Sequence, residues 1–600
     1  MFRLSSTLTP ALLSASLVPA QYIGSEACRA CHSAQFTSQS KTGHAHALAP
    51  ATKGSPGQWA FGAGAVAITY VSQADEDGYI EHGLSYYASI RSMALTPGHA
   101  SASDRRYRTF DPVASVLRCF RCHSTGPLTL GPRYSIQPSE LGVRCESCHG
   151  PGEAHVKAAG SILNPGKLPA GQINEFCGTC HRKPPESGEE TDWTNAWNTR
   201  HEPDYLSHAT CFRKSGGALT CLTCHDPHQP LSQTAASYDK RCVGCHAVVR
   251  HRVAVAKQAC VGCHMPQVQT GPHLRFTNHW IGVYENGSHL VPKRRIVKGL
   301  LPLQLAVPKG VSFSAPADPS SLRPLFEQAL ADHPKAPRSA ADLGLFLKSV
   351  GQAAAAEAPL RKALELDLAN SDPMLAADQE NLASLLVSLG RQAEALELFM
   401  QAAGGSDSAV AARSYAGLAA LDPARAESYY RSGLEAEERA AGKDHSQVAV
   451  FLNNLALALR QRGDNASAEP LLRRALAIQE KALGPDHAAV ASTLNNLGSL
   501  LQSTGRLAEA ERVERRALRI FEQKLGPESM ELAITCSNLA DLEWSKGDLS
   551  AAESFYRRAL SIDESVYGPD HPEVAADLAN LGLLLKETRK PARANPKPTH

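Results

Sequence analysis

The chain has 600 residues, too many for one hydrophobic core, so we expect at least two domains. Its 61 Lys and Arg nearly balance 59 Asp and Glu, for a net charge of +2, and neither half carries the dense basic patch that nucleic-acid binding requires. Aromatic content is low, at 6%, and Ala and Leu are abundant, which favours helix.

The chain begins with the features of a secretory signal peptide. One arginine precedes a short, moderately apolar run, and Val18, Pro19 and Ala20 place small residues where a signal peptidase cleaves. The run is shorter than the ~20 apolar residues that a membrane-spanning helix needs, and no other segment is a candidate. We therefore predict a signal peptide at residues 1–20, no integral membrane span, and a bacterial protein that is periplasmic or otherwise exported.

Cysteine is the most informative residue type. Fifteen of the 16 cysteines lie between Cys28 and Cys263, and 14 of these form seven pairs with two residues between the partners. The pairs are Cys28/Cys31, Cys119/Cys122, Cys145/Cys148, Cys177/Cys180, Cys221/Cys224, Cys242/Cys245 and Cys260/Cys263. A histidine follows each pair at once: His32, His123, His149, His181, His225, His246 and His264. We call these Cys-x-x-Cys-His segments motifs 1 to 7 in chain order.

Three chemistries use paired cysteines: zinc binding, disulfide bonding and thioether attachment of haem. Cys242 to Cys263 comes close to the spacing of a four-cysteine zinc ribbon, but a zinc site makes no demand on the residue after each pair. Only 24 of the 600 residues are histidine, so seven in that position are not expected by chance. A disulfide framework has no reason to repeat one local spacing seven times. The pattern therefore favours haem c, seven groups in all, covalently bound.

Haem attachment explains each part of the motif. The two thiols add to the two vinyl groups of one porphyrin, and the histidine binds the iron as proximal ligand. Residues 21–300 show no sustained helical or strand periodicity, and Gly, Pro, Ser and Thr recur throughout. Seven haem groups would supply the apolar core that this segment lacks, so we expect a loop-rich domain that does not fold without haem.

The second axial ligand of each iron must come from outside the motifs. Residues 21–300 contain 12 further histidines, more than the seven needed if every iron binds two imidazoles. The sequence does not tell which of them serves which iron. The best candidates lie near motifs or in tight loops: His44 or His46, His99, His155, His228, His251 and His279. The leftover Cys211 could be a packing residue, an unusual ligand or a redox group, and packing is favoured.

Several segments resemble the cytochrome c-554 family of multihaem cytochromes. They are YIGSEACRACHSAQFTSQSKTGHAHA, FGAGAVAITY with LSYYASIRSMALTPGH, GVRCESCHGPGEAH, and CVGCHMP with HLRFTNHW, and they cover most of residues 21–285. GVRCESCHGPG and CHDPH are also similar to parts of pentahaem nitrite reductases. The resemblance implies an exported electron-transfer protein with closely packed haems that mostly bind two histidines. The motif histidines would be the proximal ligands, and the distal candidates would be His44 or His46, His99, His155, His228 and His279.

Two departures from these families bear on function. Seven motifs exceed the four of the small cytochromes. No Cys-x-x-Cys-Lys motif is present, although its lysine binds the catalytic haem in most of the nitrite reductases. The second departure weighs against an enzyme.

After Pro319 the sequence becomes repetitive. Glycine-containing turns recur every 42 residues, at Gly442, Gly484, Gly526 and Gly568. The segments between them align, as in LNNLALALRQRGDNASAEPLLRRALAI and LNNLGSLLQSTGRLAEAERVERRALRI. A fixed period with two helical patterns per unit predicts an α-solenoid. In the first unit the residues predicted to be buried are Leu452, Leu455, Leu459, Ala468, Leu472, Ala475 and Ile478.

These units resemble the 42-residue tetratricopeptide repeats of kinesin light chains, and weaker units with turn glycines Gly351 and Gly390 precede them. Cys536 stands where the other units have leucine, so we expect it to be a packing residue. The turns within units contain Gly463, Gly505 and Gly547, and the loops between units contain His445, His487 and His571, which we expect to be structural caps.

One polar column in the repeats has two interpretations. Asn454, Asn496, Asn538 and Asn580 recur at the 42-residue period. They are either solvated or helix-bridging amides, or, as the resemblance implies, concave-face residues that bind the backbone of an extended peptide. The sequence favours neither interpretation over the other.

The chain is thus predicted to be mainly α: a loop-rich multihaem cytochrome c domain at 21–300, a linker at 301–320, a tetratricopeptide-repeat solenoid at 321–588 and a disordered tail at 589–600. The leading functional hypothesis is electron transfer between haems, with the solenoid docking a redox partner protein or another protein or peptide. The alternatives are a multihaem reductase or oxidase of a small nitrogen or sulfur compound with one open iron, and a haem sensor with the repeats as output.

Overall fold

The computed structural model describes residues 21–588 except 65, 100, 113–115, 159–161, 182–200, 208, 210, 213–214, 216–217, 233, 235, 246–259, 282–283, 285–318, 525–528 and 570. The side chains of residues 158, 236, 244, 245, 319 and 588 are also outside the description. The predicted signal peptide, most of the predicted linker and the predicted tail therefore lie outside the described residues. So do His246, His251 and the side chain of Cys245.

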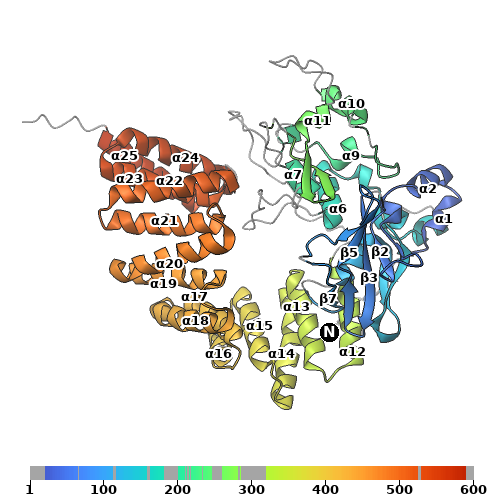
Figure 1. Cartoon of the computed structure of the whole chain (residues 1–600), viewed down its shortest axis with the longest axis horizontal. Coiled ribbons are helices and arrows are strands. Elements are labelled where there is room, and N and C mark those ends of the chain that lie inside the picture. Colours follow the sequence, from blue (N-terminus) through green and yellow to red (C-terminus); the bar gives the residue numbers. More distant parts are fainter. Residues whose placement is uncertain are drawn as a thin grey trace, which may run out of the picture.

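The described chain forms an N-terminal part with a β-sheet and short helices, and a helical C-terminal part (Figure 1). The N-terminal sheet is antiparallel, with strand order β1-β2-β3-β4-β7, and β5 pairs with both β3 and β6. Its strands are β1 (Leu48–Pro50), β2 (Trp59–Phe61), β3 (Ala67–Asp75), β4 (Gly78–Glu81), β5 (Leu84–Tyr87), β6 (Ser92–Leu95) and β7 (Arg105–Arg108).

The sheet was not predicted from the sequence. Its longest strand, β3, contains the run Ile68 to Val71, whose β-branched and aromatic residues favour strands. Its burial does not alternate along the strand, so the period-2 signal is weak. Val71 lies opposite Trp59 of β2 and Glu81 of β4. The sheet gives the N-terminal part buried protein side chains, among them Phe61, Val71 and Tyr79.

Two small hairpins and a set of short helices complete the N-terminal part. The hairpins are β8 (Ser124–Leu130) with β9 (Ile136–Leu141), and β10 (Gln267–Gly271) with β11 (Leu274–Thr277). The helices are α1 (Ser25–Arg29), α2 (Ser33–Gln39), α3 (Val116–His123), α4 (Cys145–His149), α5 (Glu153–Ala158), α6 (Ala170–His181), α7 (Glu202–Ser207), α9 (Cys221–Cys224), α10 (Ala236–Cys245) and α11 (Cys260–His264). Short 3-10 turns span His44–His46, Pro132–Tyr134 and Pro165–Lys167.

Helix pairs stack along the C-terminal part as a solenoid, which confirms the predicted fold class (Figure 1). After a 3-10 turn at Pro319–Leu322, its helices are α12 (Arg323–Asp332), α13 (Pro337–Ser349), α14 (Ala353–Asn370), α15 (Leu375–Ser388), α16 (Gln392–Ala403), α17 (Ser408–Leu421), α18 (Ala426–Ala441), α19 (Ser446–Gln461), α20 (Asn465–Leu483), α21 (Ala488–Ser503), α22 (Leu507–Lys524), α23 (Met530–Lys546), α24 (Leu549–Tyr567) and α25 (Pro572–Thr588). A further 3-10 turn spans Pro423–Arg425.

The predicted solenoid core is confirmed. All seven apolar residues predicted to be buried in the first aligned unit are at most 6% exposed. Cys536 is fully buried among leucines, as expected of a packing residue. Gly463, Gly505 and Gly547 have φ of 82°, 76° and 86°, a left-handed conformation that ends a helix and that other residues adopt only with strain.

Two of the predicted caps are visible at helix N-termini. Nδ1 of His487 accepts a hydrogen bond from the backbone N–H of Ala489 at the start of α21. His571 makes the same contact with Glu573 at the start of α25. His445 instead lies 3.2 Å from the Glu437 carboxylate.

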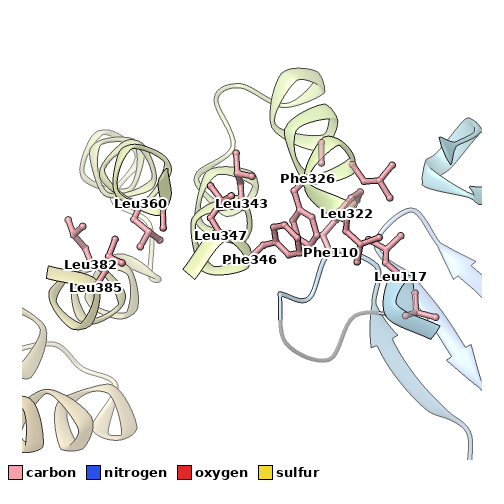
Figure 2. Packing of buried hydrophobic residues seen from close by; sticks show 14 of the residues in the cluster. Phe110, Leu117, Leu322, Phe326, Leu343, Phe346, Leu347, Leu360, Leu382 and Leu385 are labelled. Atoms are coloured by element: carbon pink, nitrogen blue, oxygen red, sulfur yellow. The ribbon is translucent and has the colours of Figure 1, made fainter. Parts of the chain in front are cut away.

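The first solenoid helices and the sheet domain share one hydrophobic core (Figure 2). Phe110, which follows β7, packs edge-on against Phe326 of α12, with ring centroids 5.7 Å apart. Phe326 stacks in turn on Phe346 of α13, at 4.3 Å. The two parts are therefore joined by buried side chains as well as by the chain. No described helix is long and apolar enough to cross a membrane.

Candidate functional site

Motifs 2, 3, 4 and 7 lie on short helices that end at the motif histidine, namely α3, α4, α6 and α11. In motif 5, helix α9 ends at Cys224, directly before His225. Residues three and four positions apart lie on the same face of a helix, so the two thiols and the imidazole of one motif are presented to one side. This local geometry suits one flat ligand per motif.

Motif 1 departs from this arrangement at Cys31. Helix α1 ends at Arg29, so Cys31 lies in the turn between α1 and α2, and its side chain is exposed, whereas Cys28 is half-buried. The backbone N–H of His32 still donates to the carbonyl oxygen of Cys28 over 2.9 Å, which keeps the helical spacing of the motif.

Cys31 shares its exposure with three other motif cysteines, Cys119, Cys180 and Cys263. The thioether bonds of these residues stay predictions.

Motif 2 is fixed to the sheet by a residue inside the motif. Phe120 lies between its two cysteines and is fully buried. The rings of Trp59, Phe61 and Tyr79 surround it edge-on at centroid distances of 5.5, 5.0 and 5.9 Å. The sheet, which the sequence did not predict, thus positions one of the motifs.

Four motif histidines each face a histidine from outside the motifs. The distances between ring centroids are 6.3 Å for His32 and His155, 6.0 Å for His149 and His228, 5.9 Å for His181 and His44, and 6.2 Å for His225 and His279. These partners are far apart in the sequence, by 137 positions for His44 and His181. All four distal residues were among the candidates proposed from the sequence.

The spacing of these pairs fits one metal ion between two imidazoles. A transition metal lies about 2 Å from an imidazole nitrogen, and the nitrogen lies about 1.1 Å from its ring centroid, so two imidazoles on opposite sides of one ion have centroids about 6 Å apart. The four distances therefore fit two imidazoles that bind one metal ion.

Burial favours the neutral form that binds metals in four of these imidazoles. Burial, followed by the nearby His181, His225 and His123, lowers the pKa of His44 to about 4. Burial is also the largest cause that lowers the pKa of His149, His225 and His279. The exception is His181, whose pKa is raised mainly by its contact with Glu202.

Several of the imidazoles have their tautomer fixed by a backbone carbonyl. Nδ1 of His123 lies 3.0 Å from the oxygen of Ala47, and Nδ1 of His149 lies 2.8 Å from that of Leu163. A carbonyl oxygen can only accept, so Nδ1 donates and Nε2 keeps its lone pair. This is the arrangement by which a metal-binding histidine is usually oriented.

Motifs distant in the sequence lie next to one another. Thiols touch between motifs 1 and 3, through Cys28 and Cys145. Motif 4 touches two others, motif 2 through Cys180 with Cys122 and motif 5 through Cys177 with Cys221. Groups attached to these motifs would be close neighbours.

The guanidinium of Arg121, inside motif 2, also fits the chemistry of haem. Its Nε and Nη1 atoms are buried and have no hydrogen-bond partner among the described residues. Buried polar atoms without a partner are costly, and the carboxylates of haem propionates would accept hydrogen bonds from these. The donor set, the imidazole spacing and this guanidinium all fit a haem group.

The other candidate ligands are placed differently. His99 uses both ring nitrogens, Nδ1 with the oxygen of Ser103 and Nε2 with Oε2 of Glu81, each at 3.1 Å. His46 is exposed. Cys211 packs against the cluster of Tyr205, Phe212 and Trp280. Within the described part of the chain, no three His, Cys, Asp or Glu side chains gather as a metal site would require.

Two charged residues at the site were missed from the sequence. Arg121 was detectable, because it lies inside a motif. Glu202 gave no signal, since it contacts His181 from the start of α7, 21 positions later. Burial would raise the pKa of Glu202, and the ion pair with His181 outweighs it, so this pKa is lowered.

Comparison with known families bears out both resemblances. Residues 86–150 match the sequence model of the family "Cytochrome c554 and c-prime". Residues 418–481, 447–523 and 528–596 match that of the tetratricopeptide repeat. The first match implies covalently bound haem c and an exported protein, and the second implies protein–protein interaction. A search of curated proteins finds no match.

Solved structures similar to this chain include helical-repeat proteins. One is the crystal structure of BtubC (BKLC) from P. vanneervenii, with 24% identity over 41% of this chain and 94% of that one and a TM-score of 0.30. Another is the crystal structure of the APC/C hetero-tetramer Cut9-Hcn1, with 15% identity over 46% of this chain and 49% of that one and a TM-score of 0.33.

Proposed function

We propose that the N-terminal part carries seven covalently attached haems, one on each motif, and transfers electrons between them. The four imidazole pairs at 5.9–6.3 Å carry this proposal. In it, the motif cysteines form the thioether bonds and the motif histidines are proximal ligands. The distal ligands are His155 for motif 1, His228 for motif 3, His44 for motif 4 and His279 for motif 5.

Two histidines on an iron favour electron transfer over catalysis. When bound, such a haem supplies a one-electron couple, with both axial positions of the iron filled. The chain's own residues hold the imidazoles in place, and burial favours the neutral form of His44, His149, His225 and His279. The thiol contacts that link motifs 1 and 3, and motif 4 with motifs 2 and 5, support haem groups close enough to exchange electrons.

The solenoid is proposed to dock a protein partner, such as a redox protein, in the exported compartment. Its C-terminal end has a pocket of about 630 Å³ between α21, α23 and α25, lined in part by Asp541, Trp544 and Glu587. In the asparagine column, Asn496 donates to Oδ1 of Asn453 in the preceding repeat, at 3.0 Å. That contact favours the bridging role for Asn496, and the pocket is the better candidate for a partner's side chain.

One experiment tests the haem proposal directly. The chain is expressed in a bacterium with a cytochrome c maturation system, separated on a denaturing gel, stained for haem peroxidase activity, and assayed for haem content as the pyridine adduct. We expect seven haems per chain that stay with the polypeptide. A colourless denatured chain would overturn the proposal.

A further inference from the structure

The histidine of motif 4 differs from its neighbours in what lies behind its ring. Nδ1 of His181 is 3.4 Å from Oε2 of Glu202, the first residue of α7. The glutamate side chain is only 28% exposed, so water screens its charge weakly. The ring therefore lies between His44 on one side and a half-buried carboxylate on the other.

The motif 2 and motif 3 histidines have neutral partners at the same ring atom. Nδ1 of His123 faces the carbonyl of Ala47 and Nδ1 of His149 faces the carbonyl of Leu163, at 3.0 and 2.8 Å. The molecule thus contains an internal comparison. Of these three motif histidines, only His181 has a full negative charge behind its own ring. In motif 3 the negative charge lies instead behind the partner histidine, where Oδ1 of Asp226 is 3.2 Å from Nδ1 of His228.

A carboxylate at this position makes the imidazole a stronger electron donor. Its negative charge lies 3.4 Å from Nδ1 and so favours the metal ion of higher charge. Groups behind a ligand are one of the ways in which a protein sets the potential of a haem. Ferric iron is then stabilised relative to ferrous iron.

We propose that Glu202 is a positioning residue that lowers the reduction potential of the haem on motif 4. The inference rests on the proposed haem content. The reaction at this haem is the gain or loss of one electron, and no bond forms or breaks. Because motif 4 touches motifs 2 and 5, its haem would be a relay between theirs.

The test is a redox titration of the purified holoprotein, followed by haem absorption and by low-temperature electron paramagnetic resonance. Glu202→Gln keeps the shape of the side chain and removes its charge. We expect one of the one-electron midpoints to move to a more positive potential, by at least tenfold in the reduction equilibrium, or 59 mV. The control Glu175→Gln removes a carboxylate from the same helix as His181, about 9 Å along its axis, and should move no midpoint by that amount.

The possible outcomes separate this inference from the proposed function. A Glu202→Gln protein with a full haem content and all midpoints unchanged would overturn the role of Glu202. A wild-type chain without covalent haem would overturn the proposed function instead. If Glu202→Gln does not accumulate, the test uses Glu202→Asp, whose carboxylate lies one methylene farther from the ring. This variant should raise one midpoint potential by a smaller amount than is expected for Glu202→Gln. Unchanged midpoints in Glu202→Asp would also overturn the inference.

Discussion

Arg108 and Asp342 are 234 positions apart in the sequence, yet Nη2 of Arg108 donates to Oδ2 of Asp342 over 2.7 Å. Arg108 ends the sheet strand β7 and Asp342 lies on solenoid helix α13, so this ion pair connects the two parts of the chain. The Asp342 side chain is 5% exposed, and its burial raises its pKa. The carboxylate therefore depends on Arg108 and on Arg338, 3.3 Å away, for compensation.

Replacing this arginine should weaken the junction. In Arg108→Ala the buried Asp342 keeps only the more exposed Arg338, and we expect a loss of about 2 kcal/mol in the free energy of unfolding, measured by urea denaturation. The control is Arg106→Ala, which breaks an ion pair with Asp75 whose side chains are 52% and 45% exposed. The control should cost less than about 1 kcal/mol. Equal losses in both variants would contradict a buried role for Arg108.

The aromatic contact at the same junction should couple the unfolding of the two parts. Phe326 is 1% exposed and contacts both Phe110 and Phe346. Phe326→Ala leaves a cavity between the sheet domain and the solenoid, at a cost of about 3–5 kcal/mol. In the wild type, the thermal unfolding curves followed by circular dichroism and by haem absorption should have the same midpoint. In Phe326→Ala the two midpoints should differ. Coincident transitions in the variant would mean that other contacts hold the parts together.

The solenoid contains a buried acid that should make its stability depend on pH. Glu514 of α22 is fully buried, and neither carboxylate oxygen has a hydrogen-bond partner among the described residues. Burial, with a smaller contribution from Asp541, raises its pKa to about 8. A carboxyl with a raised pKa keeps its proton when folded and loses it when unfolded. Its stabilising effect is therefore complete below about pH 4.5 and is lost as the pH rises through 8.

We expect the wild-type chain to lose stability between pH 5 and pH 9, as seen in the urea midpoint of the helical signal. Glu514→Leu should reduce this loss and add a few kcal/mol at pH 9, because the equivalent position one repeat earlier holds the buried Leu472. The remaining loss would come from Asp367 and Asp563, whose pKa values burial raises to about 7 and about 6. Glu365→Gln, at an exposed side chain of the same solenoid, is the control and should leave the pH profile unchanged. If stability changes with pH in Glu514→Leu as it does in the wild type, the pH dependence arises from other groups.

The sequence predicted the features that depend on neighbouring residues. The motifs, the 42-residue period, the turn glycine Gly463 and the packing of Cys536 follow from spacing alone. The sheet was missed because β3 is flanked by glycines and its burial does not alternate along the strand. Its residues become strands through pairing with β2 and β4, which a local pattern does not encode.

The pairing of imidazoles is also a tertiary property. His44 and His46 are two positions apart and look equivalent in the sequence, and the choice between them depends on a helix that begins 124 positions after His46. His99 lies in a tight loop as the other candidates do, but Glu81 and Ser103 occupy its nitrogens. The contact of a charged residue with a proposed ligand, such as that of Glu202 with His181, also cannot be predicted from the sequence without the fold.

His44 and His46, two positions apart, allow a direct test of the proposed distal ligand of motif 4. Both side chains are exposed, and of the two it is His44 whose ring faces His181, with centroids 5.9 Å apart. His44→Ala removes the proposed distal ligand of motif 4 and should leave its iron with an open axial position. We expect the ferric protein to gain the high-spin signal of one haem and to bind cyanide or, when reduced, carbon monoxide.

His46→Ala changes the same residue type two positions away and should stay fully low-spin with the same haem content. A high-spin signal in His46→Ala together with none in His44→Ala would reverse the assignment, because the iron of motif 4 would then be held by the other imidazole.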